Sequence, residues 1–288
     1  MHYLELHKLI KVIENNPLYF LCTAVTLFIS FSIFGGGLLG TVTVTIIYTV
    51  SVIVAVFQGD RILRFVMNVR PLETKREKEY LLPLFEEVIW EAGEQNPEVK
   101  YIELCIIDSV SINACAIGTQ TIAITKGAMK TFSADELKAI IAHEIGHIVS
   151  GDTMASLLFI IGNGLFTIGI VLCKLILFAF HSVGIGVQGD AGKTSPYAKI
   201  IIGLFKIILF AFSFIINFFI AINSRKNEYR ADRYVHSLGY GDEMVSALYL
   251  IEDIVLSGDR KIIDKLVASH PITAKRIGAL EWLIDSEE

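Results

Sequence analysis

The chain has 288 residues, of which 53% are hydrophobic and 19% are charged, and its formal net charge at pH 7 is −5. Its mean hydropathy of +0.58 is higher than a soluble domain of this length usually reaches, so we predict a membrane protein. The small, diffuse charge argues against nucleic acid as a partner. The four cysteines show no Cys-x-x-Cys spacing, so we expect neither a disulfide framework nor a cysteine-ligated zinc site.

Four hydrophobic segments are long enough to cross a bilayer, which takes roughly 17–20 apolar residues. Residues 17–34 and 38–57 are separated by three glycines and are predicted to form a first hairpin, and residues 154–180 and 197–222 are predicted to form a second. Each arm of the second hairpin contains one lysine, Lys174 or Lys206. These lysines either reach the membrane interface or line a polar cavity, and we favour the interface.

Basic residues follow the second and the fourth hydrophobic segments, and the positive-inside rule therefore places the flanking regions in the cytoplasm. These residues are Arg61, Arg64, Arg70, Lys75, Arg76, Lys78, Arg225, Lys226, Arg230 and Arg233. We predict a multi-pass protein of the cell (inner) membrane. Its predicted parts are a transmembrane hairpin (1–60), a cytoplasmic part (61–153), a second transmembrane hairpin (154–222) and a cytoplasmic helical part (223–288).

Between the hairpins, residues 73–93 have the apolar periodicity of a helix, and residues 101–107, 112–117 and 121–125 have the composition of short strands. A second helix is predicted to begin after Ser133, which can form a capping box with Glu136. After the second hairpin the chain is predicted to be largely helical, with a break at Gly239-Tyr240-Gly241 and a helix from about residue 242 to 256.

His143-Glu144-Ile145-Gly146-His147, an HExxH motif, lies on the helix that follows Ser133. Residues four apart project from nearly the same helical face, so the two imidazoles can bind one metal ion. The intervening Glu144 can then reach a water bound to that metal. Alone, the motif could also be a chance match whose histidines are solvated or hydrogen-bonded.

A catalytic zinc site usually has three protein ligands, so a third must come from elsewhere in the chain. Asp152 lies five residues after His147 and is predicted to sit on another part of the same helix, which argues against it. Glu228 and Asp232 follow the fourth hydrophobic segment and are four residues apart, so one can bind the metal while the other orients a ligand histidine. Spacing alone does not distinguish this pair from a solvated, charged helix start.

Three motifs together resemble the HtpX-type zinc metallopeptidases, a group related to the CAAX prenyl endopeptidases. They are HEIGH, SRKNEYRAD at residues 224–232 and SHPITAKRI at residues 269–277, and the order of the hydrophobic pairs is also similar. Residues 113–118 are similar to the family's NAFATG-like segment, although Cys115 stands where an aromatic residue is usual. The resemblance implies an α-helical integral membrane protein with four transmembrane helices and a mostly helical, zincin-like catalytic domain that carries a small β-sheet.

The resemblance also implies a set of ligands and a base. His143, His147 and Glu228 would bind one zinc ion per subunit, and Glu144 would act as the general base. Asp232 would hold a ligand histidine in orientation.

Further roles are implied around this centre. His270 would either donate a hydrogen bond to the developing oxyanion or bind the metal as a fourth ligand. Arg276 would brace the site through its carboxylates. Asn113 and Ala114 would lie on an edge strand to which an extended substrate adds by β-augmentation.

The residues predict a membrane-integrated hydrolytic metal centre that faces the cytoplasm. The resemblance implies a zinc endopeptidase that cleaves misfolded or damaged membrane proteins as part of protein quality control. Its expected partners are membrane-protein or unfolded polypeptide substrates and the lipid bilayer, and a homo-oligomer is left open. Two alternatives are a CAAX-type processing endopeptidase that acts on a specific peptide and a non-catalytic membrane module with structural zinc.

Overall fold

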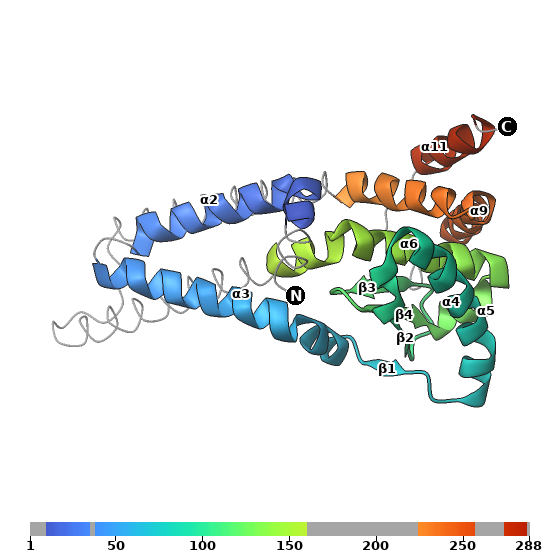
Figure 1. Ribbon diagram of the computed structural model, residues 1–288, viewed down its shortest axis with the longest axis horizontal. Coiled ribbons are helices and arrows are strands. Elements are labelled where there is room, and N and C mark those ends of the chain that lie inside the picture. Colours follow the sequence, from blue (N-terminus) through green and yellow to red (C-terminus); the bar gives the residue numbers. More distant parts are fainter. Residues whose placement is uncertain (1–9, 35–37, 160–223, 257–273, 287–288) are drawn as a thin grey trace, which may run out of the picture. The chain divides into compact units, whose positions relative to one another are not determined.

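The computed structural model describes residues 10–34, 38–159, 224–256 and 274–286 (Figure 1). The chain divides into two compact units, one formed by Met1–Pro17, Ala55–Leu157 and Ser224–Glu288, the other by Leu18–Val54 and Leu158–Asn223. Most of the predicted second hairpin, with Lys174 and Lys206, lies outside the described residues, as does His270. The predicted division into four parts therefore stays a prediction.

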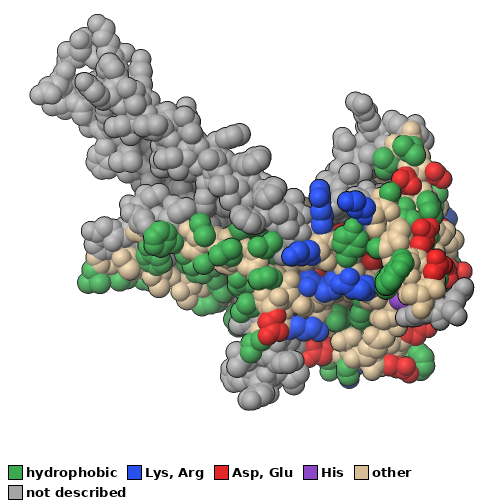
Figure 2. All heavy atoms as spheres, turned by 90° about the horizontal axis from the view of Figure 1, so that it is seen from above, with side chains coloured by type: hydrophobic (Ala, Val, Ile, Leu, Met, Phe, Trp, Pro, Cys, Tyr) green, Lys and Arg blue, Asp and Glu red, His purple; other side chains and the backbone are tan. Residues whose placement is uncertain are grey.

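The described part of the second unit consists mainly of helix α2 (Pro17–Phe34) and the first part of helix α3 (Leu38–Val66). Helix α2 has the bounds predicted for the first hydrophobic segment, and α3 begins where the second was predicted to begin but continues to Val66, beyond the predicted end at residue 57. Large hydrophobic side chains are exposed along both, including Leu21, Phe28, Leu38, Ile46 and Val50, and hydrophobic side chains are visible on the surface in Figure 2. Within the described ranges, no helix has both the length and the hydropathy that crossing a membrane requires.

A four-stranded sheet lies in the first unit. Its strands are β1 (Val69–Pro71), β2 (Glu103–Ile107), β3 (Ala114–Ile117) and β4 (Thr121–Thr125), in the order β1-β2-β4-β3. Strands β2 and β4 are parallel, and the two outer pairs are antiparallel. Strand β3 is thus at the edge of the sheet. The three predicted strands are confirmed, whereas β1 was missed because three residues that end in proline show no alternating pattern.

Labelled helices of the first unit pack against this sheet and against one another (Figure 1). They are α4 (Lys75–Gln95), α5 (Lys126–Thr131), α6 (Ala134–Ser150), α9 (Gly241–Leu256) and α11 (Ala274–Asp285), and the short 3-10 helix η1 (Pro97–Tyr101) follows α4. A further helical stretch covers residues 224–237. The prediction of a mostly helical catalytic part with a small sheet is confirmed.

Helix α6 occupies the centre of this unit, where it contacts β3, β4, α4 and α9. Leu137, Ile141 and Ile145 are completely buried on it. Removing each such side chain from water contributes about 1.5–3 kcal/mol, so the helix that carries the HExxH motif is among the most firmly held elements of the fold.

Local signals fix both ends of α6. Ser133 and Glu136 form the predicted capping box, in which each side chain accepts a hydrogen bond from the backbone of the other. At the other end, Gly151 adopts a left-handed conformation with φ of 76°, which ends the helix after Ser150. The chain then turns into a new helix over residues 152–159.

A glycine inside the motif permits close helix packing. A Cβ atom at Gly146 would lie 3.1 Å from Cα of Ala231 and 3.3 Å from Cβ of Tyr234. Since contacts of that length are tighter than ordinary van der Waals packing, the missing side chain lets the helix over residues 224–237 approach α6 closely. This approach brings Glu228 to the two histidines of the motif.

Candidate metal centre

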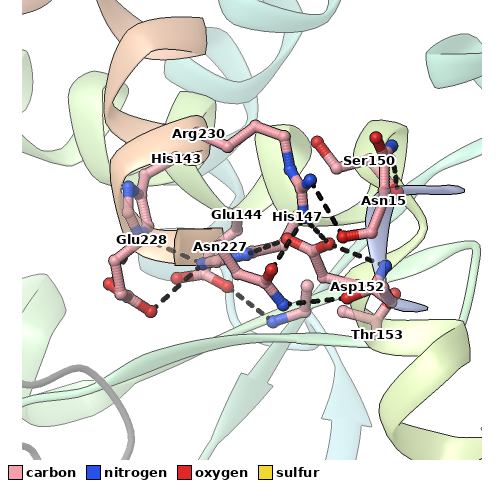
Figure 3. A network of polar contacts seen from close by, with 12 residues as sticks. Asn15, His143, Glu144, His147, Ser150, Asp152, Thr153, Asn227, Glu228 and Arg230 are labelled. Atoms are coloured by element: carbon pink, nitrogen blue, oxygen red, sulfur yellow. Dashed lines mark hydrogen bonds and ion pairs between the residues drawn. The ribbon is translucent and has the colours of Figure 1, made fainter. Parts of the chain in front are cut away.

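Three potential metal ligands converge at the junction of α6 and the helix over residues 224–237 (Figure 3). The Nε2 atoms of His143 and His147 are 3.2 Å apart, and the Glu228 carboxylate oxygens lie 3.4 Å and 3.5 Å from them. All three side chains are buried. The resemblance had grouped the same three residues, and the structure places them together.

These distances match the geometry of a tetrahedral metal site. Ligand atoms about 2.05 Å from a zinc ion at tetrahedral angles are about 3.3 Å from one another. The set of two imidazole nitrogens and one carboxylate is typical of catalytic zinc sites, which leave a fourth position open for water or substrate. The residues present therefore fit a divalent metal ion.

Glu144 lies between the two histidines in sequence and turns toward the sheet. Its Oε2 atom accepts a 2.7 Å hydrogen bond from the backbone N–H of Ala116 on strand β3, and the side chain is 2% exposed. This contact holds the carboxylate beside the cluster of ligands. A carboxylate fixed in this place can accept and release a proton during hydrolysis of a substrate.

His143 is oriented from behind by a carboxylate and an arginine. Its Nδ1 atom lies 3.1 Å from Oδ1 of Asp232, and Arg276 donates to both Asp232 oxygens at 2.8 Å and 2.6 Å. Burial raises the pKa of Asp232, but the hydrogen bonds from Arg276 and His143 outweigh burial and lower this pKa below its usual value. An ionised Asp232 keeps the proton of His143 on Nδ1 and thus directs the Nε2 lone pair toward the metal position.

Arg276 also lies 2.7 Å from the Glu228 carboxylate through its Nη1 atom, so it contacts two of the acidic residues of the centre. It is 2% exposed. Its position agrees with the bracing role that the resemblance implied.

His147 has an equivalent partner that the sequence interpretation did not identify. Its Nδ1 atom lies 3.0 Å from Oδ2 of Asp152, and Arg230 donates to Oδ1 of the same carboxylate at 2.6 Å. Burial lowers the pKa of His147, but Asp152 and Glu228 outweigh burial and raise this pKa to about 10. A metal ion bound at His147 would displace this proton.

The expected position of Asp152 on the same helix as the motif is wrong. Helix α6 ends at Ser150, and the left-handed turn at Gly151 redirects the chain so that Asp152 faces back toward His147. The signal that could have revealed this was the glycine itself, because a glycine after a run of helical residues commonly marks a helix C-terminus. Asp152 is still not part of the ligand cluster, as the sequence interpretation held.

Asn113 and Ala114 line a pocket beside the metal ligands. Its other lining residues come from α5–α6, α9 and α11 and are Phe132, Ile140, His143, Glu144, Met244, Leu248, Ile251 and Arg276. Asn113 precedes β3, and its backbone carbonyl accepts a hydrogen bond from the N–H of Thr125. Ala114 is the first residue of the edge strand. Six of the lining residues offer apolar side chains, so this pocket suits an apolar group.

A sequence model of peptidase family M48 matches residues 75–284, which is well over half of the chain. Protease HtpX of Pseudomonas syringae pv. tomato is 29% identical over 230 residues, covering 71% of this chain and 72% of that protein. Protease HtpX of Hahella chejuensis is 27% identical over 254 residues, covering 79% and 80%. A protease HtpX homolog of Nitrosomonas eutropha is 30% identical over 200 residues, covering 62% and 64%.

Among solved structures, the crystal structure of S. mikatae Ste24p aligns with 97% of this chain and 66% of that chain, at 20% identity and a TM-score of 0.48. This likeness is below the level that establishes a common fold. The family model and the HtpX relatives are sufficient by themselves to assign the chain to a family. The chain belongs to peptidase family M48 and is a metallopeptidase similar to the HtpX proteases.

Proposed function

We propose that this protein is a membrane-integrated, zinc-dependent endopeptidase that cleaves membrane proteins, in particular misfolded or damaged ones. The observation that carries the proposal is the convergence of His143, His147 and Glu228, whose ligand atoms all lie within 4.8 Å of one another. The buried carboxylate of Glu144 lies beside them. Zinc is preferred because two imidazoles and one carboxylate are a common catalytic zinc set, although the same ligands also accept other divalent ions.

In this proposal His143, His147 and Glu228 hold the zinc ion. When bound, zinc supplies Lewis acidity and lowers the pKa of a water molecule. Glu144 accepts a proton from the attacking water and delivers it to the leaving amine, while the Ala116 N–H keeps its carboxylate in place.

The substrate is proposed to bind as an extended chain along strand β3. Strand β3 pairs only with β4 in the described sheet. On its other edge the Ala116 N–H binds Glu144, and the backbone at Ala114 is proposed to pair with the substrate. The adjacent pocket, with Phe132, Met244 and Leu248 among its lining residues, would take an apolar side chain. Backbone hydrogen bonds depend little on the side chains of the substrate, so many sequences can bind in this way. An apolar pocket suits segments that leave a bilayer. Both features support membrane-protein substrates.

A location in the cell (inner) membrane is supported by the composition and by the exposed hydrophobic side chains along α2 and α3. The four predicted membrane-spanning segments and the basic residues that follow two of them support a catalytic site that faces the cytoplasm. His270 is proposed to serve as an oxyanion donor or as a fourth ligand in a resting state, and a homo-oligomer is left open.

Two other functions, a CAAX-type processing endopeptidase and a non-catalytic module with structural zinc, predict different observations. A CAAX-type endopeptidase would cut a narrow set of peptides, so a cleavage-site profile on mixed substrates distinguishes it. A structural zinc site would normally be closed by four protein ligands. The catalytic function is favoured because the carboxylate of Glu144 is fixed next to the clustered ligands, where it can serve as a base.

The test compares the wild type with Glu144→Gln in degradation of an unfolded membrane protein, with metal chelation and zinc add-back. We expect Glu144→Gln to retain zinc and to lose proteolysis by a factor of about 10²–10⁴, because the proton acceptor is gone. Glu86→Gln, on the exposed side of α4, is the matched control and should cleave at the wild-type rate. Proteolysis by Glu144→Gln at the rate of this control would refute the mechanism.

A further inference from the structure

We propose that Asn16, acting through Asp152, is a positioning residue for His147, so that metal retention depends on the docking of the chain's N-terminal segment. The inference rests on the proposed metal centre, in which His147 is a ligand. Asn16 lies more than 120 residues before the HExxH motif in the sequence. None of the sequence motifs connects this part of the chain with the metal centre.

Asp152 is the group through which Asn16 reaches the metal centre. One oxygen of its carboxylate, Oδ2, faces the Nδ1 atom of His147 at 3.0 Å. The other, Oδ1, accepts hydrogen bonds from Arg230 at 2.6 Å and from the side-chain amide of Asn16 at 3.2 Å. The two donors on Oδ1 set the rotation of the carboxylate and therefore the direction in which Oδ2 holds the imidazole.

Asn16 itself is completely buried and belongs to a closed ring of polar side chains. Its Oδ1 atom accepts a hydrogen bond from Asn227 at 3.1 Å, and Arg230 donates to Oδ1 of Asn227 at 2.7 Å while it also binds Asp152. The ring Asn16–Asp152–Arg230–Asn227 thus joins three segments that are far apart in sequence. Buried polar rings of this kind hold their members in one arrangement, since any rotation leaves a buried group without its partner.

The N-terminal segment is held in this position by further contacts. Asn15 donates from its side chain to the carbonyl of Ser150 at 2.9 Å, and its own carbonyl accepts from Arg230 at 3.2 Å. Val12 packs against the turn at Gly151, where an added Cβ atom would meet Val12 Cγ2 at 2.4 Å. The segment therefore lies directly against the turn that carries Asp152.

A comparison of the two ligand histidines shows why Asn16 matters for one of them. At His143, Arg276 binds both oxygens of Asp232 in a forked arrangement. At His147, Arg230 donates to Oδ1 of Asp152 through Nη2, and Asn16 supplies a second donor to the same oxygen. Among the described residues, the donors that hold Asp152 opposite His147 thus come from two segments of the chain, whereas Asp232 is held opposite His143 by a bidentate arginine.

The experiment measures the zinc dissociation constant of the full-length protein in detergent by competition with a chelator. Loss of a partner behind a metal ligand typically weakens metal binding by about 10–100-fold. We expect Asp152→Asn to fall within this range and Asn16→Ala to weaken zinc about tenfold. Asn96→Ala is the matched control, because it removes an amide hydrogen bond to Tyr234 and should leave the zinc affinity unchanged.

Two additional readouts separate positioning from a merely structural role. The melting temperature of the metal-free protein reports folding, and the visible absorption spectrum of the cobalt-substituted protein reports the geometry of the ligands. Asn16→Ala should change the cobalt spectrum, whereas Asn96→Ala should not. If Asn16→Ala does not fold, Asn15→Ala at a half-buried position replaces it and should weaken zinc in the same direction.

Zinc affinity and a cobalt spectrum equal to those of the wild type in the folded Asn16 or Asn15 variant would overturn this inference and leave the proposed function intact. A wild-type protein that binds no divalent metal would instead overturn the proposed metal centre, and the inference with it. The two failures are therefore distinguishable.

Discussion

Replacing Arg276 by methionine removes a cation that contacts both Asp232 and Glu228. The guanidinium lies 2.6–2.8 Å from these carboxylates, and all three side chains are at most 4% exposed. Methionine fills a similar volume without charge, so the carboxylates remain buried and lose their partner. Breaking a buried ion pair in this way costs about 3–5 kcal/mol.

The loss of stability caused by Arg276→Met should be larger without metal than with it, and this dependence makes the prediction specific. At about 2–4 °C per kcal/mol for a chain of this size, the metal-free Arg276→Met protein should melt about 6–20 °C below the wild type. With saturating zinc the difference should shrink, because the ion neutralises Glu228 and the variant then leaves only Asp232 without its arginine.

The assay is thermal melting of both proteins in detergent, with chelator and with zinc. Arg233→Met, on an exposed position of the same helix as Asp232, is the control and should melt within about 2 °C of the wild type. An Arg276→Met protein that melts with the wild type in chelator would refute the reasoning. So would a difference that zinc leaves unchanged.

Three further predictions concern the support of the site. Glu77 is buried, and hydrogen bonds from Arg70 hold the pKa of its carboxyl well below the ordinary value. The contribution of ionised Glu77 to stability is therefore complete above about pH 4.3 and is lost as the pH falls. The melting temperature should drop more steeply between about pH 5 and pH 2 in the wild type than in Glu77→Gln. Ser133→Ala removes the capping box of α6 and should cost about 1 kcal/mol in the free energy of unfolding, measured by denaturant titration, and no loss would contradict the capping argument. Gly151→Ala places a Cβ atom at a φ of 76° and against Val12, so it should lower the zinc affinity as well as the melting temperature, and wild-type values of both would show that the turn tolerates a side chain.

Local patterns in the sequence predicted the elements that form from neighbouring residues. The capping box at Ser133, the apolar face of α6 and the three strands β2, β3 and β4 all depend on residues within a few positions of one another. The short strand β1 has too few residues to give a pattern and was missed.

The site was predictable only in part, because its contacts join distant segments. Glu228 could be placed beside His143 by resemblance to a family, since the spacing of two carboxylates gave no unique answer. The polar ring behind His147 had no signal at all in the sequence, because Asn16 and Asn227 are 211 positions apart. Asp152 was misplaced because the helix was assumed to continue through Gly151.

The central claim is that two histidines and one glutamate hold a zinc ion at the active site. Zinc-edge X-ray absorption of the purified full-length protein tests it most directly. We expect about one zinc ion per chain, with nitrogen and oxygen neighbours at about 2.0–2.2 Å and an imidazole signal that falls when His147 is replaced by alanine. Sulfur neighbours at about 2.3 Å, or a spectrum that the His147→Ala substitution leaves unchanged, would contradict the account.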